Sequence, residues 1–522
     1  MKGDSSAVRE SGITPSERYL ARLCKSTFLS LWSYPNLYRD QGRTSKTSDG
    51  KELCDLLVVC GDDVVIFSDK NCQFKWTGDL DVDWFRWYRR AVIKSVKQIY
   101  GAERWLKEFP LDIYTDRKCQ QAFPLTLPSQ RAMKVHRVVV ASGVKSACQR
   151  HFGGGTGSLI VASDSPDGGS DSAAYPLPFH LGPVGGKHGF VHVFDEVALN
   201  IILTELDTVI DFVMYLQQRR RLFSSKSVVV ATGEEDLLGR YLIQIDEDGQ
   251  HWWREADGYD GYSVCEGSWD HVQSHPQYLR RKKADHVSYW WDQLIELVAS
   301  NSYAGTLMDY GMTDLASNER LLRIMASEPR LSRRINAVSF LQFLETAPMS
   351  KRSARVLKSA QFADRAYVFV ALPRRDGITE EEYRKVRCFL LYAYCLVLGA
   401  RNRELREIVG IGTEPGIDNE GRSTDFAAFV PSEWTDELLR EAAQLQKDHK
   451  ILAQETLPWQ HQHSQEYPDE TTDVHGVSLH SGRRTRRNRR RKGQAARGKR
   501  GRNDLCPCGS LKKYKKCCGK SS

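Results

Sequence analysis

Four cysteines lie close together near the end of the chain, at Cys506, Cys508, Cys517 and Cys518. The first two flank a proline and precede Gly509, where the backbone can fold back sharply. Four thiolates arranged as a tetrahedron are a common zinc site, and paired cysteines at both ends of a short segment are typical of it. The sequence therefore predicts a small structural zinc knuckle whose folding depends on the metal.

This segment resembles the SEC-C motif, the metal-binding tail of the bacterial preprotein translocase ATPase and of many unrelated bacterial proteins. The likeness lies in Cys506-Pro-Cys-Gly-Ser510 and in Lys512-Lys-Tyr-Lys-Lys-Cys-Cys518. It implies Zn²⁺ held by the four cysteines and a bacterial source. The rest of the chain contains no G-x-x-x-x-G-K-[ST] phosphate loop, so we do not expect that ATPase activity here.

A second set of residues that could do chemistry lies near the N-terminus. Asp55 opens one strand-like run and Lys70 ends the next, while Glu17 lies on the helix expected before them and Glu52 lies just ahead of Asp55. A metal-dependent phosphodiesterase needs carboxylates to hold Mg²⁺ and a lysine near the attacked phosphate. These four residues supply both.

The same region resembles the PD-(D/E)xK nucleases, whose order is a helix with Glu, a strand with Asp, a strand with acid-x-Lys, and a helix with a polar residue. Gln98, next to Lys97, is the polar residue of that last helix. The resemblance implies a catalytic set that consists of Glu17, Glu52, Asp55 and Lys70, with Mg²⁺.

The sequence departs from this pattern at Ser68, which stands where the family has an acid. Alternate residues of a strand share a face, so Asp69 is expected to face away from Lys70. Glu52 is expected to replace the missing acid if its strand end is bulged. An inactive nuclease-like domain that only grips nucleic acid is the alternative.

Positive charge gathers ahead of the knuckle. Twelve of the twenty residues from Arg483 to Arg502 are Lys or Arg, and none is aromatic. Such density suits phosphate backbones, with affinity that falls as salt rises. We therefore expect this basic arm to bind nucleic acid or the ribosome, and a solubilising tail is the other interpretation. The net charge of the whole chain is only +9, so the remaining chain is mildly acidic.

Composition limits the class of protein. Apolar residues make up 41% of the 522 residues, which excludes disorder throughout, and no apolar run reaches the roughly 20 residues needed to cross a bilayer. The N-terminus is polar and lacks the apolar core of a signal peptide. Nine further cysteines are scattered, as expected of reduced thiols. We expect a cytoplasmic protein without a membrane span.

The fold class expected is α/β, a multidomain α+β chain. We expect a helix–hairpin–helix nuclease-like domain over 1–115, mixed α/β over 116–260 and a helical and α/β domain over 261–455. A disordered linker with the basic arm over 456–502 and the knuckle over 503–520 complete the chain. Helices are predicted over 84–109, 196–221, 380–398 and 435–454 and through most of 285–345. Strands are predicted over 54–60, 64–68, 135–141, 159–162, 190–194, 227–232, 241–245, 367–372 and 426–430.

Two weaker patterns are interpreted as structural. A loose cluster of polar residues precedes the helix expected at 196; it consists of His180, His188, His192, Asp195 and Glu196. The glycine-rich stretch at 153–157 lacks the strand–loop–helix order of a phosphate cradle and is expected to be a plain loop.

Two functions remain open from the sequence. The leading hypothesis is a zinc-binding, nucleic-acid-associated protein with a metal-dependent nuclease domain. The alternative is a non-enzymatic adaptor whose knuckle and basic arm dock on a protein partner or ribosome.

Overall fold

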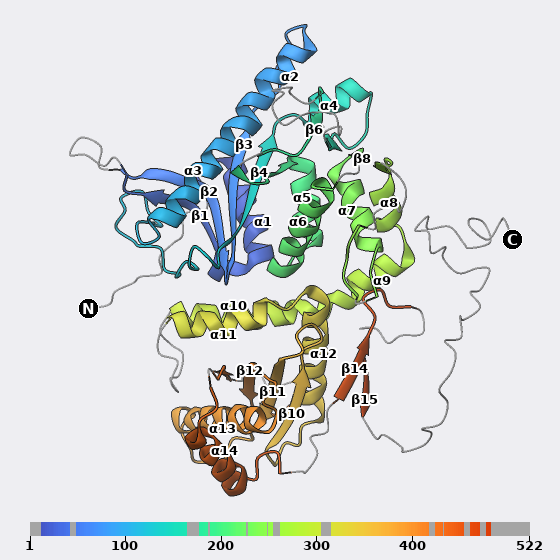
Figure 1. Ribbon diagram of the computed structural model, residues 1–522. Coiled ribbons are helices and arrows are strands. Elements are labelled where there is room, and N and C mark those ends of the chain that lie inside the picture. Colours follow the sequence, from blue (N-terminus) through green and yellow to red (C-terminus); the bar gives the residue numbers. More distant parts are fainter. Residues whose placement is uncertain are drawn as a thin grey trace, which may run out of the picture.

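The computed structural model describes residues 12–41, 49–163, 177–185, 188–225, 228–247, 249–253, 261–303, 315–416, 423–431, 433–453, 460–469 and 477–481. It is a mixed α/β protein with several separate sheets (Figure 1). No helix in these ranges is long and apolar enough to cross a bilayer.

The N-terminal sheet has five strands in the order β1-β2-β3-β4-β7. Their bounds are Ser33–Arg39 for β1, Lys51–Cys60 for β2, Asp63–Asn71 for β3, Lys134–Ser142 for β4 and His192–Asp195 for β7. The first three are antiparallel, and β4 and β7 continue parallel to β3. The predicted hairpin is confirmed, whereas β1 was not predicted. The sheet takes strands from both sides of residue 115, the first domain boundary expected.

Helices cover both faces of this sheet. Helix α1 (Pro15–Trp32) starts with the predicted capping box of Thr14 and Glu17. Helix α2 (Leu80–Tyr88), the π-helix η1 (Arg89–Ile93) and α3 (Lys94–Glu108) form one continuous rod. Phe67 packs against α1, and the next residue, Ser68, bonds to α3. Consecutive strand residues point to opposite faces, so the sheet lies between α1 and the rod.

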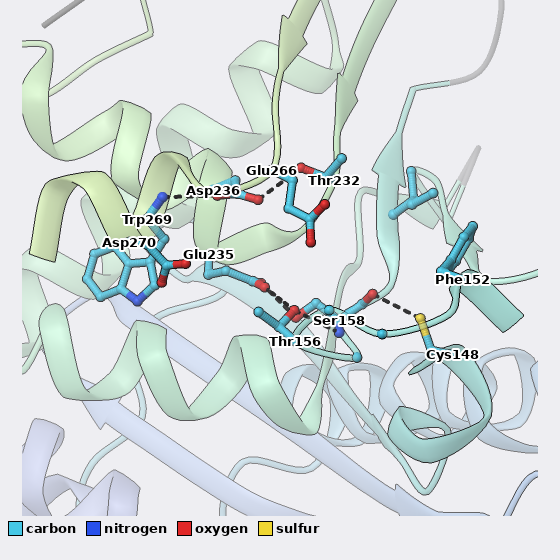
Figure 2. Close-up of a pocket in the computed structure, with 15 residues that line it drawn as sticks. Cys148, Phe152, Thr156, Ser158, Thr232, Glu235, Asp236, Glu266, Trp269 and Asp270 are labelled. Atoms are coloured by element: carbon cyan, nitrogen blue, oxygen red, sulfur yellow. Dashed lines mark hydrogen bonds between the residues drawn. The ribbon is translucent and has the colours of Figure 1, made fainter. Parts of the chain in front are cut away.

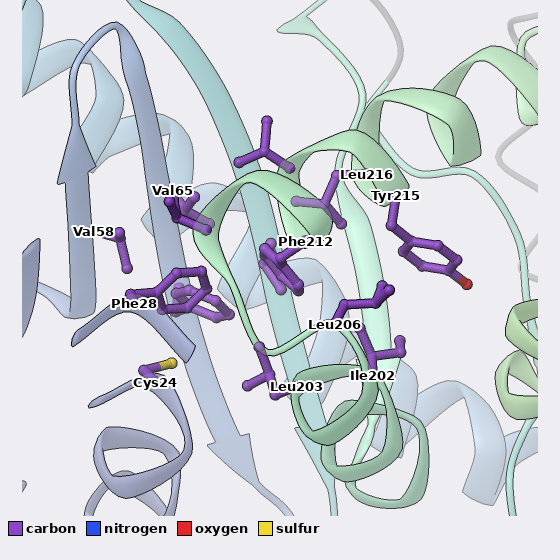
Figure 3. Close-up of a cluster of buried hydrophobic side chains, with 14 of the residues drawn as sticks. Cys24, Phe28, Val58, Val65, Ile202, Leu203, Leu206, Phe212, Tyr215 and Leu216 are labelled. Atoms are coloured by element: carbon purple, nitrogen blue, oxygen red, sulfur yellow. The ribbon is translucent and has the colours of Figure 1, made fainter. Parts of the chain in front are cut away.

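The face that carries α1 is also covered by α5 (Glu196–Glu205) and α6 (Val209–Phe223), as Figure 3 shows. Phe28 of α1 meets Phe212 of α6 edge to face, with ring centroids 5.3 Å apart. A single helix over 196–221 was expected, and this is wrong. The chain breaks at Leu206–Thr208 because the Thr208 hydroxyl accepts the backbone N–H of Asp211 and starts a second helix.

A second sheet follows the order β6-β5-β8-β9. Its strands are β5 (Ile160–Ala162), β6 (His180–Leu181), β8 (Val228–Ala231) and β9 (Gly261–Val264), with α4 (Lys145–Phe152) and α7 (Glu234–Ile243) beside them. The strand expected over 241–245 is wrong, because 241–243 end α7. Three acidic residues in the first turn of α7 favour the helix by complementing its dipole.

A helical layer connects the two halves of the molecule (Figure 1). It consists of α8 (Ser268–Gln273), α9 (Pro276–Asp285), the 3-10 helix η3 (His286–Ser288), α10 (Tyr289–Tyr303), α11 (Leu315–Ala326) and α12 (Arg330–Thr346). A buried ion network holds this layer to α6. Arg330 contacts Asp207 and Asp292, both at 2.8 Å, and Arg333 contacts Asp292 at 2.6 Å.

The third sheet has the order β10-β11-β12-β13. Its elements are β10 (Ser353–Lys358), β11 (Arg365–Ala371), α13 (Glu380–Arg401), β12 (Glu407–Thr413), β13 (Thr424–Phe429) and α14 (Asp436–His449). Strands β11 and β13 and both helices confirm the prediction, and β10 and β12 were not predicted.

The expectation of a disordered linker over 456–502 is wrong in its first part. Strand β14 (Gln460–Ser464) pairs with β15 (Val477–Ser481). Just after β14, the Glu466 carboxylate lies 3.0 Å from His251 and 3.2 Å from Arg281. These two cations outweigh the effect of burial and lower the pKa of Glu466 to about 2. The basic arm from Arg483 to Arg502 lies outside the described residues.

Candidate functional site

The N-terminal sheet opens between β2 and β3. Their pairing starts at Cys60 opposite Asp63 and ends at Leu56 opposite Phe67. Beyond that pair, β2 remains bonded to β1 and β3 remains bonded to β4. In the gap the Asp69 backbone N–H donates to a side-chain oxygen of Asp55, at 2.6 Å. We call this gap the fork; its residues are Glu17, Asn36, Glu52, Asp55, Ser68, Asp69 and Lys70.

Asn36 connects two of the acids. It is fully buried in β1 with a left-handed backbone (φ 48°), a conformation that asparagine tolerates better than most residues. Its Nδ2 donates to Glu17 and to Glu52, both at 3.2 Å. The register between β1 and β2 shifts at Leu37/Tyr38, so Glu52 does lie at an irregular strand end. Within the described chain, Asn36 Oδ1 has no hydrogen-bond donor.

The predicted residues are close enough to shift each other's pKa. Burial raises the pKa of Asp55, and Lys70 opposes that shift. Burial and the Asp55 charge raise the pKa of Glu52, which Lys70 also opposes. Burial would raise the pKa of Glu17, but hydrogen bonds from Asn36 and from its own capping box outweigh burial and lower it. Glu17, Glu52, Asp55 and Lys70 therefore lie within electrostatic range of one another.

Asp69 belongs to the same group. Its side chain is 5% exposed, and burial raises its pKa to about 6, with the charges of Asp55 and Glu17 adding to the rise. The Ser16 hydroxyl lowers it slightly, yet neither carboxylate oxygen accepts a hydrogen bond of normal geometry from the described residues. Asp69 was expected to lie away from the site. Strand β3 stays paired with β4 as far as Asn71, so alternation still places Asp69 on the α1 side, where Ser16 lies, and opposite to Lys70; its charge interacts with Asp55 across the gap.

Ser68 takes the place of the acid in the nuclease pattern. Its hydroxyl lies 3.3 Å from Gln98 Oε1 on α3, and it also lowers the pKa of Asp55. A hydroxyl in this position is neutral, so any cation at the fork would have to take its negative ligands from Asp55, Asp69 and Glu52.

The chemistry of the fork suits a hard divalent cation. Carboxylate and amide oxygens are the ligands that Mg²⁺ and Ca²⁺ prefer, and buried polar atoms normally have a partner. Oδ1 of Asn36 has none in the described chain, and the two Asp69 oxygens accept no bond of normal geometry there, although the Ser16 hydroxyl lies close enough to lower the pKa of Asp69. As the side chains stand, no group of three or more His, Cys, Asp or Glu in the described ranges could hold a metal ion. A cation would therefore have to draw the carboxylates closer together.

Sequence reasoning missed Asn36 and the role of Asp69. Asn36 was not among the candidate residues, although an Asn beside a Pro signals an irregular turn that can place a polar side chain inward. For Asp69 the sequence offers one signal, an acid directly beside the expected Lys70.

The glycine-rich stretch at 153–157 is a loop, as predicted. It borders a pocket of about 490 Å³ between α4 and α7, shown in Figure 2. Glu235 in this pocket accepts hydrogen bonds from Thr156 at 2.7 Å and Ser158 at 2.6 Å. Asp236 is bonded to Thr232 and to the backbone of Trp269. These carboxylates hold the loop and helix together, so the pocket has a structural explanation.

The polar cluster near 180–196 also has structural roles. Asp195 caps α5 by accepting from the backbone of Val197 and Ala198 and also from Leu159. Burial raises its pKa to about 7. Burial lowers the pKa of His192, and the charge of Arg219 lowers it further. The interpretation as satisfied strand ends agrees with the contacts of Asp195; Glu196 Oε1 accepts from the backbone of Gly143 and Lys145, whereas its Oε2 has no partner among the described residues.

Cys506, Cys508, Cys517 and Cys518 lie outside the described residues. A family model described as the SEC-C motif matches residues 502–520, which contain all four. SEC-C motifs are often zinc-binding. No curated protein and no solved structure matches the chain. What the comparisons establish is therefore a chain that carries a SEC-C motif at residues 502–520.

Proposed function

We propose that the N-terminal unit is a divalent-cation-dependent phosphodiesterase that acts on nucleic acid, joined to a zinc-binding SEC-C tail. The observation that carries this proposal is the fork, where acids from a helix and two strands lie within electrostatic range of a lysine, beside a buried Asn36 Oδ1 that has no donor in the described chain. The order of these elements along the chain, helix Glu17, strand Asp55, strand Lys70 and helix Gln98, supports it.

Each residue of the fork has a distinct part in this proposal. Asp55 and Asp69, with Glu52 at the rim, would hold the cation, and Asn36 Oδ1 would add a neutral oxygen. A bound Mg²⁺ neutralises charge on the phosphoryl oxygens and activates the attacking water. The Lys70 ammonium stabilises the negative charge that develops on the attacked phosphate. Glu17 keeps Asn36, and through it Glu52, in position, since one of its oxygens also caps α1.

The tail supports nucleic acid as the substrate. The basic arm from Arg483 to Arg502 would hold the polymer through its phosphates. Cys506, Cys508, Cys517 and Cys518 would bind one Zn²⁺, which supplies the folding free energy of a segment too short to have a core.

Cleavage by the purified full chain tests the proposal. With Mg²⁺ or Mn²⁺ it should cut DNA or RNA, and Lys70→Ala should reduce the rate by about 100-fold or more, the usual cost of losing a charge-stabilising donor. The control is Lys447→Ala, an exposed lysine on α14. Cleavage that survives Lys70→Ala at the control rate would show that the site is assigned wrongly.

The neutral Ser68 favours a second candidate, a non-enzymatic adaptor that binds nucleic acid, the ribosome or a protein partner without cutting. In that case hydrolysis is absent with every divalent metal, and binding depends on low salt and on Cys517.

A further inference from the structure

The rod formed by α2, η1 and α3 extends past the open end of the sheet (Figure 1). Its inner side is anchored by aromatic residues. Trp84 stacks on Trp87 with ring centroids 5.1 Å apart, and it also packs against Phe179 at 5.5 Å. Trp87 Nε1 donates to the carbonyl of Cys72 at 2.6 Å. The buried side therefore fixes the position of the rod.

On the outer side of the rod, the exposed residues from Arg86 to Lys94 are all basic. Arg86, Arg89, Arg90 and Lys94 are all exposed, and Lys75 joins them from the loop before α2. In the π-helix the Lys94 backbone N–H bonds to the Arg89 carbonyl, five residues back. This stacks Lys94 on Arg89, while Arg90 follows Arg86 at the usual spacing of four. Together the five cations line a hollow of about 470 Å³, which we call the basic groove.

Among the described residues, little neutralises the charge of the basic groove. The one acid of the groove is Asp83, whose carboxylate accepts from the Thr77 backbone at 2.5 Å and from its hydroxyl at 2.6 Å. Its nearest cation is Arg86, 3.9 Å away. The side chains of Lys75, Arg89 and Lys94 form no hydrogen bond or ion pair with any described residue. Like charges one turn apart destabilise a helix, so folding alone does not account for the stripe.

We propose that the basic groove binds the phosphate backbone of a nucleic acid and directs it to the fork. Lys94 lies four residues before Gln98, whose side chain contacts Ser68 of the fork. Four helical residues span about 6 Å, so along the rod the groove ends about one helical turn from the residue that contacts the fork. From Arg86 to Lys94 the groove runs about 12 Å, the length of three to four nucleotides of a B-form strand. This inference rests on the proposed function for its choice of substrate.

A nucleic acid fits the groove better than a membrane surface does. Three of the five cations are arginines, whose planar fork matches a phosphate with two parallel hydrogen bonds. Interfacial helices place aromatic and aliphatic residues opposite their charges, in contact with lipid. Here that opposite side is buried, with Trp84 and Trp87 inside the protein.

The salt dependence of binding tests the inference. The variant is Arg86→Gln/Arg89→Gln/Arg90→Gln in the full zinc-loaded chain, with Mg²⁺ and Mn²⁺ left out and no chelator added, so that binding is measured without cleavage. The control is Arg375→Gln/Arg403→Gln/Arg406→Gln, which removes three exposed arginines of the C-terminal αβ unit. The probes are a fluorescent DNA duplex, a fluorescent single strand and vesicles of anionic lipid. Each lost phosphate contact flattens the slope of log K against log salt by about 0.9, so the groove variant should flatten it by nearly three.

The expected result is a flatter slope and weaker nucleic-acid binding for the groove variant only. Equal slopes for the two variants would overturn the inference, since the tail alone would then hold the polymer. Loss of vesicle binding with unchanged nucleic-acid binding would overturn it in favour of a lipid headgroup. If Lys70→Ala leaves cleavage intact while the groove variant still loses binding, the groove stands and only the assigned catalytic site fails.

Discussion

Replacing Asp69 by Asn should stabilise the metal-free protein and weaken its response to Mg²⁺. Burial raises the pKa of Asp69 from 3.8 to about 6. The folded state then holds the proton more tightly than the unfolded state, so stability falls as pH rises from about 4 to about 6. Near neutral pH the full cost applies, on the order of 3 kcal/mol, because each pKa unit corresponds to about 1.4 kcal/mol. Asn carries no charge and avoids that cost.

The chain has several sheets, so its global unfolding need not be two-state. Hydrogen exchange of the β2 and β3 amides measures local unfolding of these two strands around the fork. We expect slower exchange in Asp69→Asn than in the native chain near pH 7, and little difference below about pH 4. Asp62→Asn, at an exposed acid in the β2–β3 turn, is the matched control.

Mg²⁺ supplies the second measurement. In the native chain a saturating cation should protect β2 and β3, by about 2.7 kcal/mol at a hundred times its dissociation constant. In Asp69→Asn this protection should be much smaller. Equal protection by Mg²⁺ in both proteins, or faster exchange in the metal-free variant, would refute the reasoning that the buried charge of Asp69 destabilises the metal-free protein and is offset by a bound cation.

Two further predictions concern other parts of the chain. Asp292→Ala should lower the free energy of unfolding of the helical layer, measured in urea, by about 3–5 kcal/mol, because it leaves the buried Arg330 and Arg333 without a shared partner. Asp376→Ala, at an exposed acid, is the control and should change this free energy little. Equal unfolding midpoints for the two variants would contradict the prediction. Cys517→Ser should abolish zinc binding measured by elemental analysis. The control Cys265→Ser, at an exposed cysteine, should retain the zinc. An unchanged zinc content in Cys517→Ser would mean that the tail binds no metal through these thiolates.

Local signals in the sequence predicted the elements that build the fork, but not the fork itself. The Thr14 cap, the hairpin across Gly61 and the helix that bears Gln98 depend on neighbouring residues and were predicted correctly. The opening depends on β3 pairing with β4, which follows it by more than sixty residues. Pairing at such a distance leaves no local signal. The period-two rule holds for Asp69, because β3 stays paired with β4 as far as Asn71; what the sequence did not show is the gap across which Asp69 interacts with Asp55.

The tail and the N-terminal unit also differ in how far a local signal in the sequence predicts them. The four cysteines lie at fixed spacing within one short segment, so the sequence alone was enough to identify the SEC-C motif that the comparison matches at residues 502–520. The fork assembles Glu17, Asn36 and Asp69 from three separate elements. Asn36 in particular lies on β1, which the sequence did not predict, and it takes a left-handed conformation that only its contacts with Glu17 and Glu52 explain.

The hydrogen bonds of the fork also decide which variants test it well. When β2 and β3 separate, backbone groups that would have paired must find other partners. The Asp55 carboxylate is one such partner, because it accepts the Asp69 N–H at 2.6 Å. Asp55→Ala would leave that N–H without a partner and destabilise the fork, so lost activity in that variant could not be assigned to lost chemistry. Lys70 is not the hydrogen-bond partner of any such backbone group in the described chain. Its replacement therefore changes the charge at the fork, while the backbone hydrogen bonds around the fork remain.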